Sequence, residues 1–215
     1  MKTILRIDAS SRSDGSHSRR LGDKIERELT ARNPDARIVR RELGAAPIEH
    51  IRAATITGYY TPPEAMTAEL RAATALSDKI IGEIKEADTI VIATPMYNFS
   101  IPSALKAWID QLVRVGHTFA YDGSTFTGLL QDKTVVVAIA YGAGGYTHGG
   151  AFAVADFVQP YLRFLFNFLG IQDVRFVAIE WTTGDAKTIE EEMRRAEAEI
   201  GSVLAAWAKG RRNTQ

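Results

Sequence analysis

Residues 94–102 combine the side chains of this sequence that are best suited to binding a ligand. They follow an apolar run at residues 90–93, which predicts a buried strand, and they lead into a segment with helical apolar spacing. Ligands of open α/β sheets bind at the carboxyl ends of strands. Two prolines, an aromatic ring, an amide and free backbone N–H groups suit the edge of a flat heterocycle, such as a flavin or a purine, better than a phosphate. An ordinary strand-to-helix turn beginning with proline would have the same composition.

Residues 10–18 form a serine-rich stretch that opens a predicted first helix. A helix N-terminus has unpaired N–H groups and a positive partial charge, so it can bind a phosphate. Ser10, Ser16 and Ser18 would add hydroxyl donors, and Gly15 allows a tight turn. The spacing matches neither G-x-G-x-x-G nor the Walker loop, which argues against a Rossmann-type dinucleotide dehydrogenase and against an NTPase. A simple serine cap of a helix is the alternative.

A third loop, residues 141–146, contains three glycines within four residues. Such a backbone can pass close to the edge of a ligand, although it can also form a flexible turn. The three loops follow three different predicted strands, so in a parallel sheet they meet at one rim. Their coincidence at that rim predicts a ligand site more strongly than any one loop does.

Apolar β-branched runs alternate with helically spaced segments about five times along the chain, a pattern typical of a parallel sheet covered by helices on both faces. We predict a doubly wound α/β fold with a single five-stranded parallel sheet, flavodoxin-like, in the strand order 2-1-3-4-5. Its ligand crevice would lie beside the first and third strands. The predicted strands are residues 3–9, 37–41, 89–93, 134–140 and 174–179.

One domain of residues 1–210 is expected, with a disordered tail at residues 211–215. The clearest predicted helix is residues 105–113, because Pro102 precedes apolar residues at helical spacing. Residues 43–61 have no clean period, and long loops in compact domains are usually functional or mobile.

Composition narrows the classes of function. The 26 basic residues balance 26 acidic ones, so no global field recruits nucleic acid or an anionic membrane. The absence of cysteine excludes disulfides, thiolate metal sites and a catalytic thiol, and a cytoplasmic location is the simplest interpretation. The four histidines lack metal-ligand spacing, so no metal is expected. No apolar run approaches the roughly 20 residues of a membrane span.

Residues 95–110, Pro-Met-Tyr-Asn-Phe-Ser-Ile-Pro-Ser-Ala-Leu-Lys-Ala-Trp-Ile-Asp, closely resemble the signature of FMN-dependent NADH azoreductases. Those enzymes belong to the flavodoxin-like NAD(P)H:quinone oxidoreductases. The resemblance spans most of the chain in the family's order and spacing, and it implies noncovalent FMN, one per subunit. It continues through residues 111–121, 144–145, 160–162 and 168–171.

The resemblance also implies which residues contact FMN. Those that would hold the ribityl phosphate are Ser10, Ser16, His17 and Ser18. Those that would line the isoalloxazine are Met96, Tyr97, Asn98 and Phe99, and those that would pass its other side are Gly142, Ala143, Gly144 and Gly145. The sequence departs from the family pattern at His17, where an amide is common, and at Gly142–Ala143, where Ser-Arg is common. The second departure removes an arginine that would act near the pyrimidine edge.

Aromatic residues concentrate between residues 152 and 168, which we expect to form a helix after the glycine loop. A helix with aromatics around so much of its surface has more apolar face than one sheet can bury. The surplus predicts a dimer interface, and the resemblance implies a homodimer with active sites between subunits. Tyr121, Phe164 and Phe166 are then candidates for the wall of the substrate site.

No Ser-His-Asp set, carboxylate pair or activated lysine is visible, and a flavin enzyme needs no catalytic side chain because the cofactor carries the redox chemistry. In such an enzyme NADH or NADPH passes a hydride to flavin N5, and a quinone or an aromatic azo compound then takes the electrons in a ping-pong cycle. The alternatives are a flavodoxin-type electron carrier and a non-catalytic flavin-binding regulatory module. Carriers are generally small and acidic, whereas this chain is longer and neutral.

Overall fold

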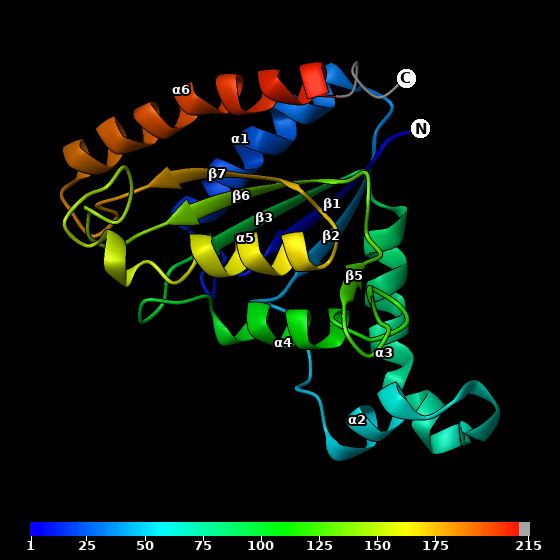
Figure 1. Ribbon diagram of the computed structural model, residues 1–215. Helices are drawn as coiled ribbons and strands as arrows, with labels where there is room; N and C mark the ends of the chain where they lie inside the picture. The colour runs from blue at the N-terminus through cyan, green and yellow to red at the C-terminus, as the bar shows by residue number, and fades with distance from the viewer. Residues whose placement is uncertain (211–215) are drawn as a thin grey trace.

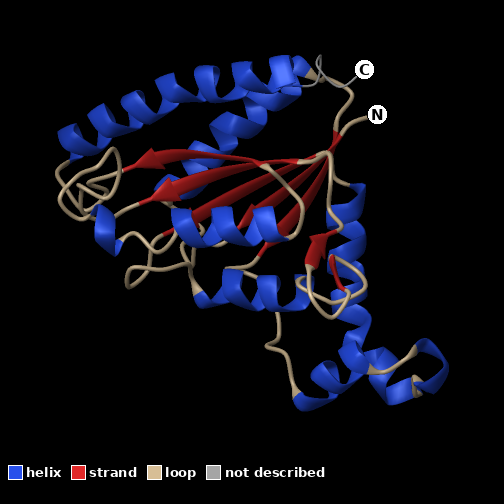
Figure 2. Cartoon of the chain, in the orientation of Figure 1, coloured by secondary structure: helices blue, strands red, loops and turns tan. Residues whose placement is uncertain are grey.

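Five parallel strands form the centre of the protein in the computed structural model, which describes residues 1–210 and the side chains of residues 1–205. The strands lie in the order β2-β1-β3-β6-β7, and they diverge from one end of the sheet in Figure 2. The predicted flavodoxin-like order is therefore confirmed. The strands are β1 (Thr3–Asp8), β2 (Arg37–Glu42), β3 (Thr89–Pro95), β6 (Thr134–Ala140) and β7 (Asp173–Ile179).

The two central strands, β3 and β6, are apolar on both faces because both faces are covered by helices. They pair in parallel with Ile90 opposite Val135 and Pro95 opposite Ala140. Every residue of β6 is buried, as is every residue of β3 before Pro95. This rigid centre fixes the carboxyl ends of three neighbouring strands, β1, β3 and β6, at one rim.

Two helical layers enclose the sheet (Figure 1). On one face α1 packs with α6, and their buried residues join a cluster with Ile4, Val91 and Val136. On the other face α3, α4 and α5 share a larger cluster around Leu5, Ile90 and the fully buried Trp108. The helices are α1 (His17–Arg32), α3 (Ala68–Glu86), α4 (Ser103–Leu112), α5 (Gln159–Phe168) and α6 (Ala186–Gly210).

Three features differ from the sequence-based expectation. Residues 43–61 include a helix, α2 (Ala53–Tyr60), whose low amphipathicity hid it, followed by the short helix η1 (Pro63–Ala65). Strands β4 (Phe119–Tyr121) and β5 (Phe126–Gly128) form a hairpin of only three pairs, too short to show alternation. The expected helix over residues 152–168 begins only at Gln159, and the residues before it include the short helix η2 (Ala153–Ala155).

Among residues 1–210, no helix has both the length and the apolar character needed to cross a membrane. The tail expected at residues 211–215 lies outside the described residues.

Candidate functional site

The loop between β1 and α1 presents hydroxyl groups at a helix N-terminus. Ser16 is the N-cap of α1, and its Oγ accepts a hydrogen bond from the N–H of Arg19 at 3.4 Å. Ser16 Oγ also lies 3.2 Å from Ser18 Oγ. Gly15 has a φ of +65°, a left-handed conformation that glycine adopts without strain. The loop therefore directs serine hydroxyls and the first N–H groups of α1 toward one place.

The loop after β3 makes a tight turn in a strained conformation. Tyr97 and Ser100 exchange two backbone hydrogen bonds, with the Tyr97 N–H donating at 2.9 Å and the Ser100 N–H donating at 3.1 Å. Between them, Asn98 and Phe99 both have positive φ, +49° and +69°. These values match a type I′ turn, whose second position normally holds glycine. A bulky residue there is an outlier, and such backbone strain clusters at ligand sites.

The glycine loop after β6 is held by the turn that follows β7. Thr182 donates to the Tyr141 carbonyl oxygen through both its N–H and its hydroxyl, at 3.1 and 2.9 Å. Thr183 donates to the Gly142 carbonyl oxygen in the same two ways, at 3.1 and 2.8 Å. The glycine loop is thus anchored on one side, which leaves its other side free to face a ligand.

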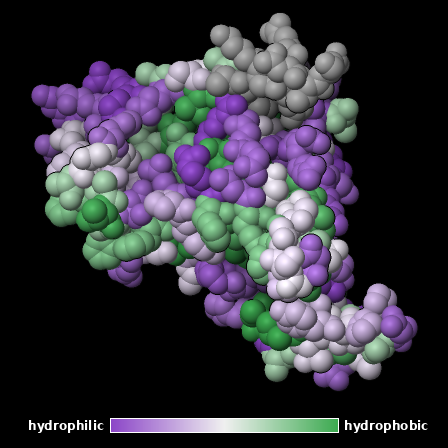
Figure 3. Space-filling model, viewed as in Figure 1, coloured by the Kyte–Doolittle hydropathy of each residue, from purple (hydrophilic) through white to green (hydrophobic). Residues whose placement is uncertain are grey.

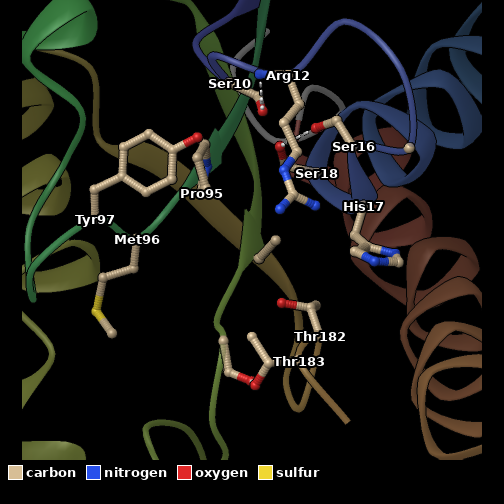
Figure 4. A pocket seen from close by; sticks show the side chains of 13 residues that line it. Ser10, Arg12, Ser16, His17, Ser18, Pro95, Met96, Tyr97, Thr182 and Thr183 are labelled. Carbon is tan, nitrogen blue, oxygen red and sulfur yellow. Dashed lines mark hydrogen bonds between the residues drawn. The ribbon is translucent and has the colours of Figure 1, made fainter. Parts of the chain in front are cut away.

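These loops enclose a cavity of about 260 Å³ at the carboxyl rim of the sheet (Figure 4). Its lining residues are Ser10, Arg12, Gly15, Ser16, His17, Ser18, Pro95, Met96, Tyr97, Ala140, Gly142, Thr182 and Thr183. The lining is rich in hydroxyl groups and contains the basic residue Arg12. None of the described residues that line it is an aspartate or a glutamate. Within residues 1–205, no cluster of His, Asp and Glu side chains could hold a metal ion.

The electrostatic state of the cavity depends on two side chains. Burial lowers the pKa of His17 below its ordinary value, and the nearby Arg20 and Arg12 lower it further. Since the ordinary pKa of histidine is about 6.5, a lowered pKa makes His17 a neutral hydrogen-bonding group at pH 7. Arg12 carries the permanent positive charge of the cavity.

Seven of the predicted contact residues line this cavity, and five do not. The seven are Ser10, Ser16, His17, Ser18, Met96, Tyr97 and Gly142. The five lie farther along the same two loops, beyond the cavity itself; they are Asn98, Phe99, Ala143, Gly144 and Gly145.

Six lining residues were not predicted as ligand contacts from the sequence: Arg12, Gly15, Pro95, Ala140, Thr182 and Thr183. Gly15 was expected only to allow a tight turn. Arg12 stands within the predicted serine-rich loop and could have been included. Thr182 and Thr183 follow the last predicted strand, so their position at the same rim was available from the strand order. Pro95 and Ala140 end strands; Pro95 was counted among the prolines of its loop, and Ala140 carried no chemical signal.

The three candidates for the substrate wall have different environments. Phe164 on α5 is 71% exposed, and Tyr121 on β4 is 50% exposed and stacks on Phe126. Phe166 has no exposed surface because it points from α5 into the core against the sheet, so its assignment to the wall is wrong. The β4–β5 hairpin also lies at the end of the sheet opposite the cavity (Figure 1). Within one subunit, Tyr121 therefore does not reach the cavity.

Comparison with known proteins identifies close relatives of this chain. A family model described as a flavodoxin-like fold matches residues 2–204. An FMN-dependent NADH:quinone oxidoreductase of Xanthobacter autotrophicus is 53% identical over 174 residues, covering 81% of this chain and 84% of the relative. One from Nostoc punctiforme is 39% identical over 208 residues, covering 96% and 100%. The crystal structure of an azoreductase from Bacillus anthracis superposes with a TM-score of 0.84 at 25% identity, covering 94% and 98%.

Proposed function

The chain belongs to the flavodoxin-like family of FMN-dependent NADH:quinone oxidoreductases, and from that premise we propose that the cavity at the carboxyl rim binds the FMN. The protein is an oxidoreductase that uses FMN and NADH. The donor set supports the placement, since three serine hydroxyls, a helix N-terminus and an arginine suit a phosphate. Met96 and Tyr97 add apolar and aromatic surface beside that polar end, as a flavin ring requires.

The chain would hold FMN through three loops with separate tasks. Ser10, Ser16 and Ser18 would donate hydrogen bonds to the phosphate, together with His17. Residues 96–99 would line the isoalloxazine, and residues 142–145 would pass along its other side. The hydrogen bonds from Thr182 and Thr183 to the glycine loop keep that loop in place before the ligand arrives. Pre-ordered loops lower the entropy lost on binding.

When bound, FMN would supply the redox chemistry of the reaction, the acceptance of a hydride from NADH and the two-electron reduction of a quinone. The side chains of this protein need only bind, orient and exclude competing reactants, so we assign none of them to bond making or breaking. An aromatic azo compound is a second acceptor class, supported by the similarity to azoreductase structures.

We also propose that the enzyme is a homodimer whose active sites lie between subunits. Support comes from exposed aromatic side chains, here together called the aromatic face: Phe99, Tyr121, Phe126, Phe152, Phe157 and Phe164. Figure 3 shows hydrophobic surface over α5 and around η2. Large exposed apolar surface of this kind marks interfaces. In a dimer, Tyr121 and Phe164 of one subunit would form the substrate wall of the other.

Two further assignments follow from this function. We propose that residues 1–210 form one FMN-binding domain, because a single sheet carries every loop of the cavity. We propose a cytoplasmic location because NADH is kept inside cells. Separation of cell extracts into soluble, membrane and secreted fractions tests the location, and recovery of the protein outside the soluble cell fraction would contradict it.

Steady-state kinetics test the proposed activity against the electron-carrier alternative. Continued turnover of NADH by the purified protein should require both FMN and a quinone, and double-reciprocal plots at several quinone concentrations should be parallel lines. A flavodoxin-type carrier would bind FMN but would not oxidise NADH by itself. A flavin-binding regulatory module would also show no turnover. Binding of FMN without quinone-dependent NADH oxidation would therefore contradict the proposal.

A further inference from the structure

Arg12 places in the cavity a guanidinium group that has no partner among the residues that the structure describes. Its backbone is fixed on both sides, because its N–H donates to Ser10 Oγ at 3.2 Å and its carbonyl oxygen accepts from Arg19 Nε at 2.9 Å. Its side chain makes no hydrogen bond or ion pair with any residue that the structure describes. In Figure 4 the guanidinium projects into the space between Pro95, His17 and Thr182, below the hydroxyls of Ser16 and Ser18.

The neighbouring arginines of α1 are neutralised, which distinguishes them from Arg12. Arg19 Nη1 donates to both carboxylate oxygens of Glu42 at 2.6 Å. Arg20 pairs with Glu190 at 3.2 Å. No carboxylate of the described residues lines the cavity around Arg12. An anionic ligand would give this guanidinium its first charged partner.

The part of the ligand that Arg12 fits is a phosphate monoester. A guanidinium can bind phosphate through two parallel N–H···O bonds, and a charge-assisted pair is about twice as strong as a neutral hydrogen bond. His17 is neutral at pH 7 and the serines carry no charge, so Arg12 alone among the lining residues offsets the phosphate charge. Riboflavin lacks the phosphate and would gain nothing from Arg12.

We propose that Arg12 determines the specificity of this protein for phosphorylated flavin, selecting FMN over riboflavin by pairing with the phosphate. This inference rests on the proposed function, since it takes the flavin to bind in this cavity. It goes further by assigning the discrimination between FMN and riboflavin to one side chain of the loop between β1 and α1.

Arg19 is the positioning residue for this interaction. Besides holding the Arg12 carbonyl oxygen, its Nη2 donates to the Ser10 carbonyl oxygen at 3.0 Å. Gly44 leaves room for the arrangement, since a Cβ there would lie 2.2 Å from the Ser10 carbonyl oxygen and 3.3 Å from Arg19 Nη2. The clamp of Arg19 and Glu42 thus orders the loop before binding, so less conformational entropy is lost when the phosphate arrives.

Binding of FMN and of riboflavin to the apoprotein tests the proposal, with dissociation constants measured by flavin fluorescence quenching. In Arg12→Gln, the FMN dissociation constant should rise about 10- to 100-fold while the riboflavin constant stays within twofold. Arg12→Lys should give an intermediate loss for FMN, because lysine keeps the charge but not the paired geometry. Arg12→Gln should also weaken the salt dependence of FMN binding.

Arg27→Gln is the matched control. Arg27 lies in α1, and its side chain makes no hydrogen bond or ion pair with the residues that the structure describes; it lies about 15 Å along the helix from its start, at 1.5 Å per residue. Its loss should leave both constants within twofold. Equal weakening of FMN and riboflavin in Arg12→Gln, or no change in either, would overturn the inference while leaving the proposed function intact. Failure of the unmodified protein to bind FMN would instead overturn the proposed function.

Discussion

The indole of Trp181 lies directly against the backbone of Gly144. A Cβ added at Gly144 would lie 2.1 Å from both Nε1 and Cε2 of Trp181, a distance at which atoms overlap. Trp181 itself has a φ of +57°, unusual for a bulky residue, and its N–H donates to the Ala143 carbonyl oxygen at 3.3 Å. The turn after β7 therefore packs on the glycine loop through its side chain as well as through its hydrogen bonds.

Gly144→Ala should destabilise the protein by about 1–3 kcal/mol, the usual cost of forcing extra atoms into a packed site. Because the displaced groups hold the glycine loop, FMN affinity should fall as well. Chemical denaturation of the apoprotein and an FMN titration measure the two effects. Gly82→Ala is the control: Gly82 lies in α3 with open space around it, and the change should stabilise the protein by about 0.5–1 kcal/mol. Unchanged stability in Gly144→Ala would show that the contact is not close.

Arg6→Met should destabilise the fold by about 3–5 kcal/mol, because it leaves the carboxylate of Asp8 buried without its charge partner. Arg6 has no exposed surface, and its Nη2 donates to Asp8 Oδ1 at 2.7 Å. Gly22 makes room for it, since a Cβ there would lie 2.4 Å from Arg6 Nη2. Denaturant unfolding measures the loss.

The exposed pair Arg37–Glu86, at 2.6 Å, provides the comparison for this buried pair. Arg37→Met should cost less than about 1 kcal/mol because solvent screens the pair. Similar losses in Arg6→Met and Arg37→Met would contradict the account of the buried pair.

His17 should make the stability of the apoprotein pH-dependent. Its pKa is lowered by burial first and by Arg20 and Arg12 next, so the folded protein binds fewer protons at this site than the unfolded chain, whose histidines titrate near 6.5. Its stabilising contribution is therefore present above about pH 6.5 and is lost as the pH falls through the lowered folded pKa. Unfolding free energies at pH 7.5 and 5.5 should differ less in His17→Gln than in the unmodified protein.

The pKa of His117 is also lowered, mainly by burial, and His117 is present in both proteins of this comparison. The difference between them therefore reports His17 alone. An identical pH dependence in the two proteins would show that His17 has the same pKa in the folded and the unfolded state.

Phe164→Glu should convert the proposed dimer into monomers, because it places a charge on an exposed side chain of the aromatic face. Quinone reduction should fall with it, while FMN binding should be retained because the cavity belongs to a single subunit. Light scattering after size-exclusion chromatography measures the mass. Tyr60→Glu, on the similarly exposed Tyr60 of α2, should leave the mass unchanged. A Phe164→Glu protein of unchanged mass, or an unmodified protein that is monomeric, would rule out this interface.

The sequence predicted the sheet well because its strands are buried on both faces, and runs such as residues 90–93 and 134–140 then contain almost only apolar β-branched residues and alanine. The hairpin β4–β5 and helix α2 were missed because neither is long or amphipathic enough to show a period. Phe166 and Phe164 are two residues apart on one helix, and which of them faces the core depends on how α5 is rotated against the sheet. That rotation is set by tertiary packing and cannot be read from the spacing of aromatics around the whole helix surface.

The loops of the site were found from strand order, since the carboxyl ends of parallel strands share a rim. The turn of Trp181, Thr182 and Thr183 was not predicted, although its place at the rim follows from the strand order, because its contacts with the glycine loop are set by tertiary packing. Arg12 was overlooked because arginines are common in solvated loops, and only the structure shows that this one lacks a carboxylate partner within residues 1–205.

The visible spectrum of the purified protein, followed through anaerobic additions of NADH and then of a benzoquinone, tests the central claim most directly. The account predicts a yellow protein with a flavin spectrum that bleaches on addition of one equivalent of NADH and regains its absorbance with one equivalent of quinone. A colourless protein that neither takes up FMN nor oxidises NADH would contradict the assignment of the rim cavity to flavin.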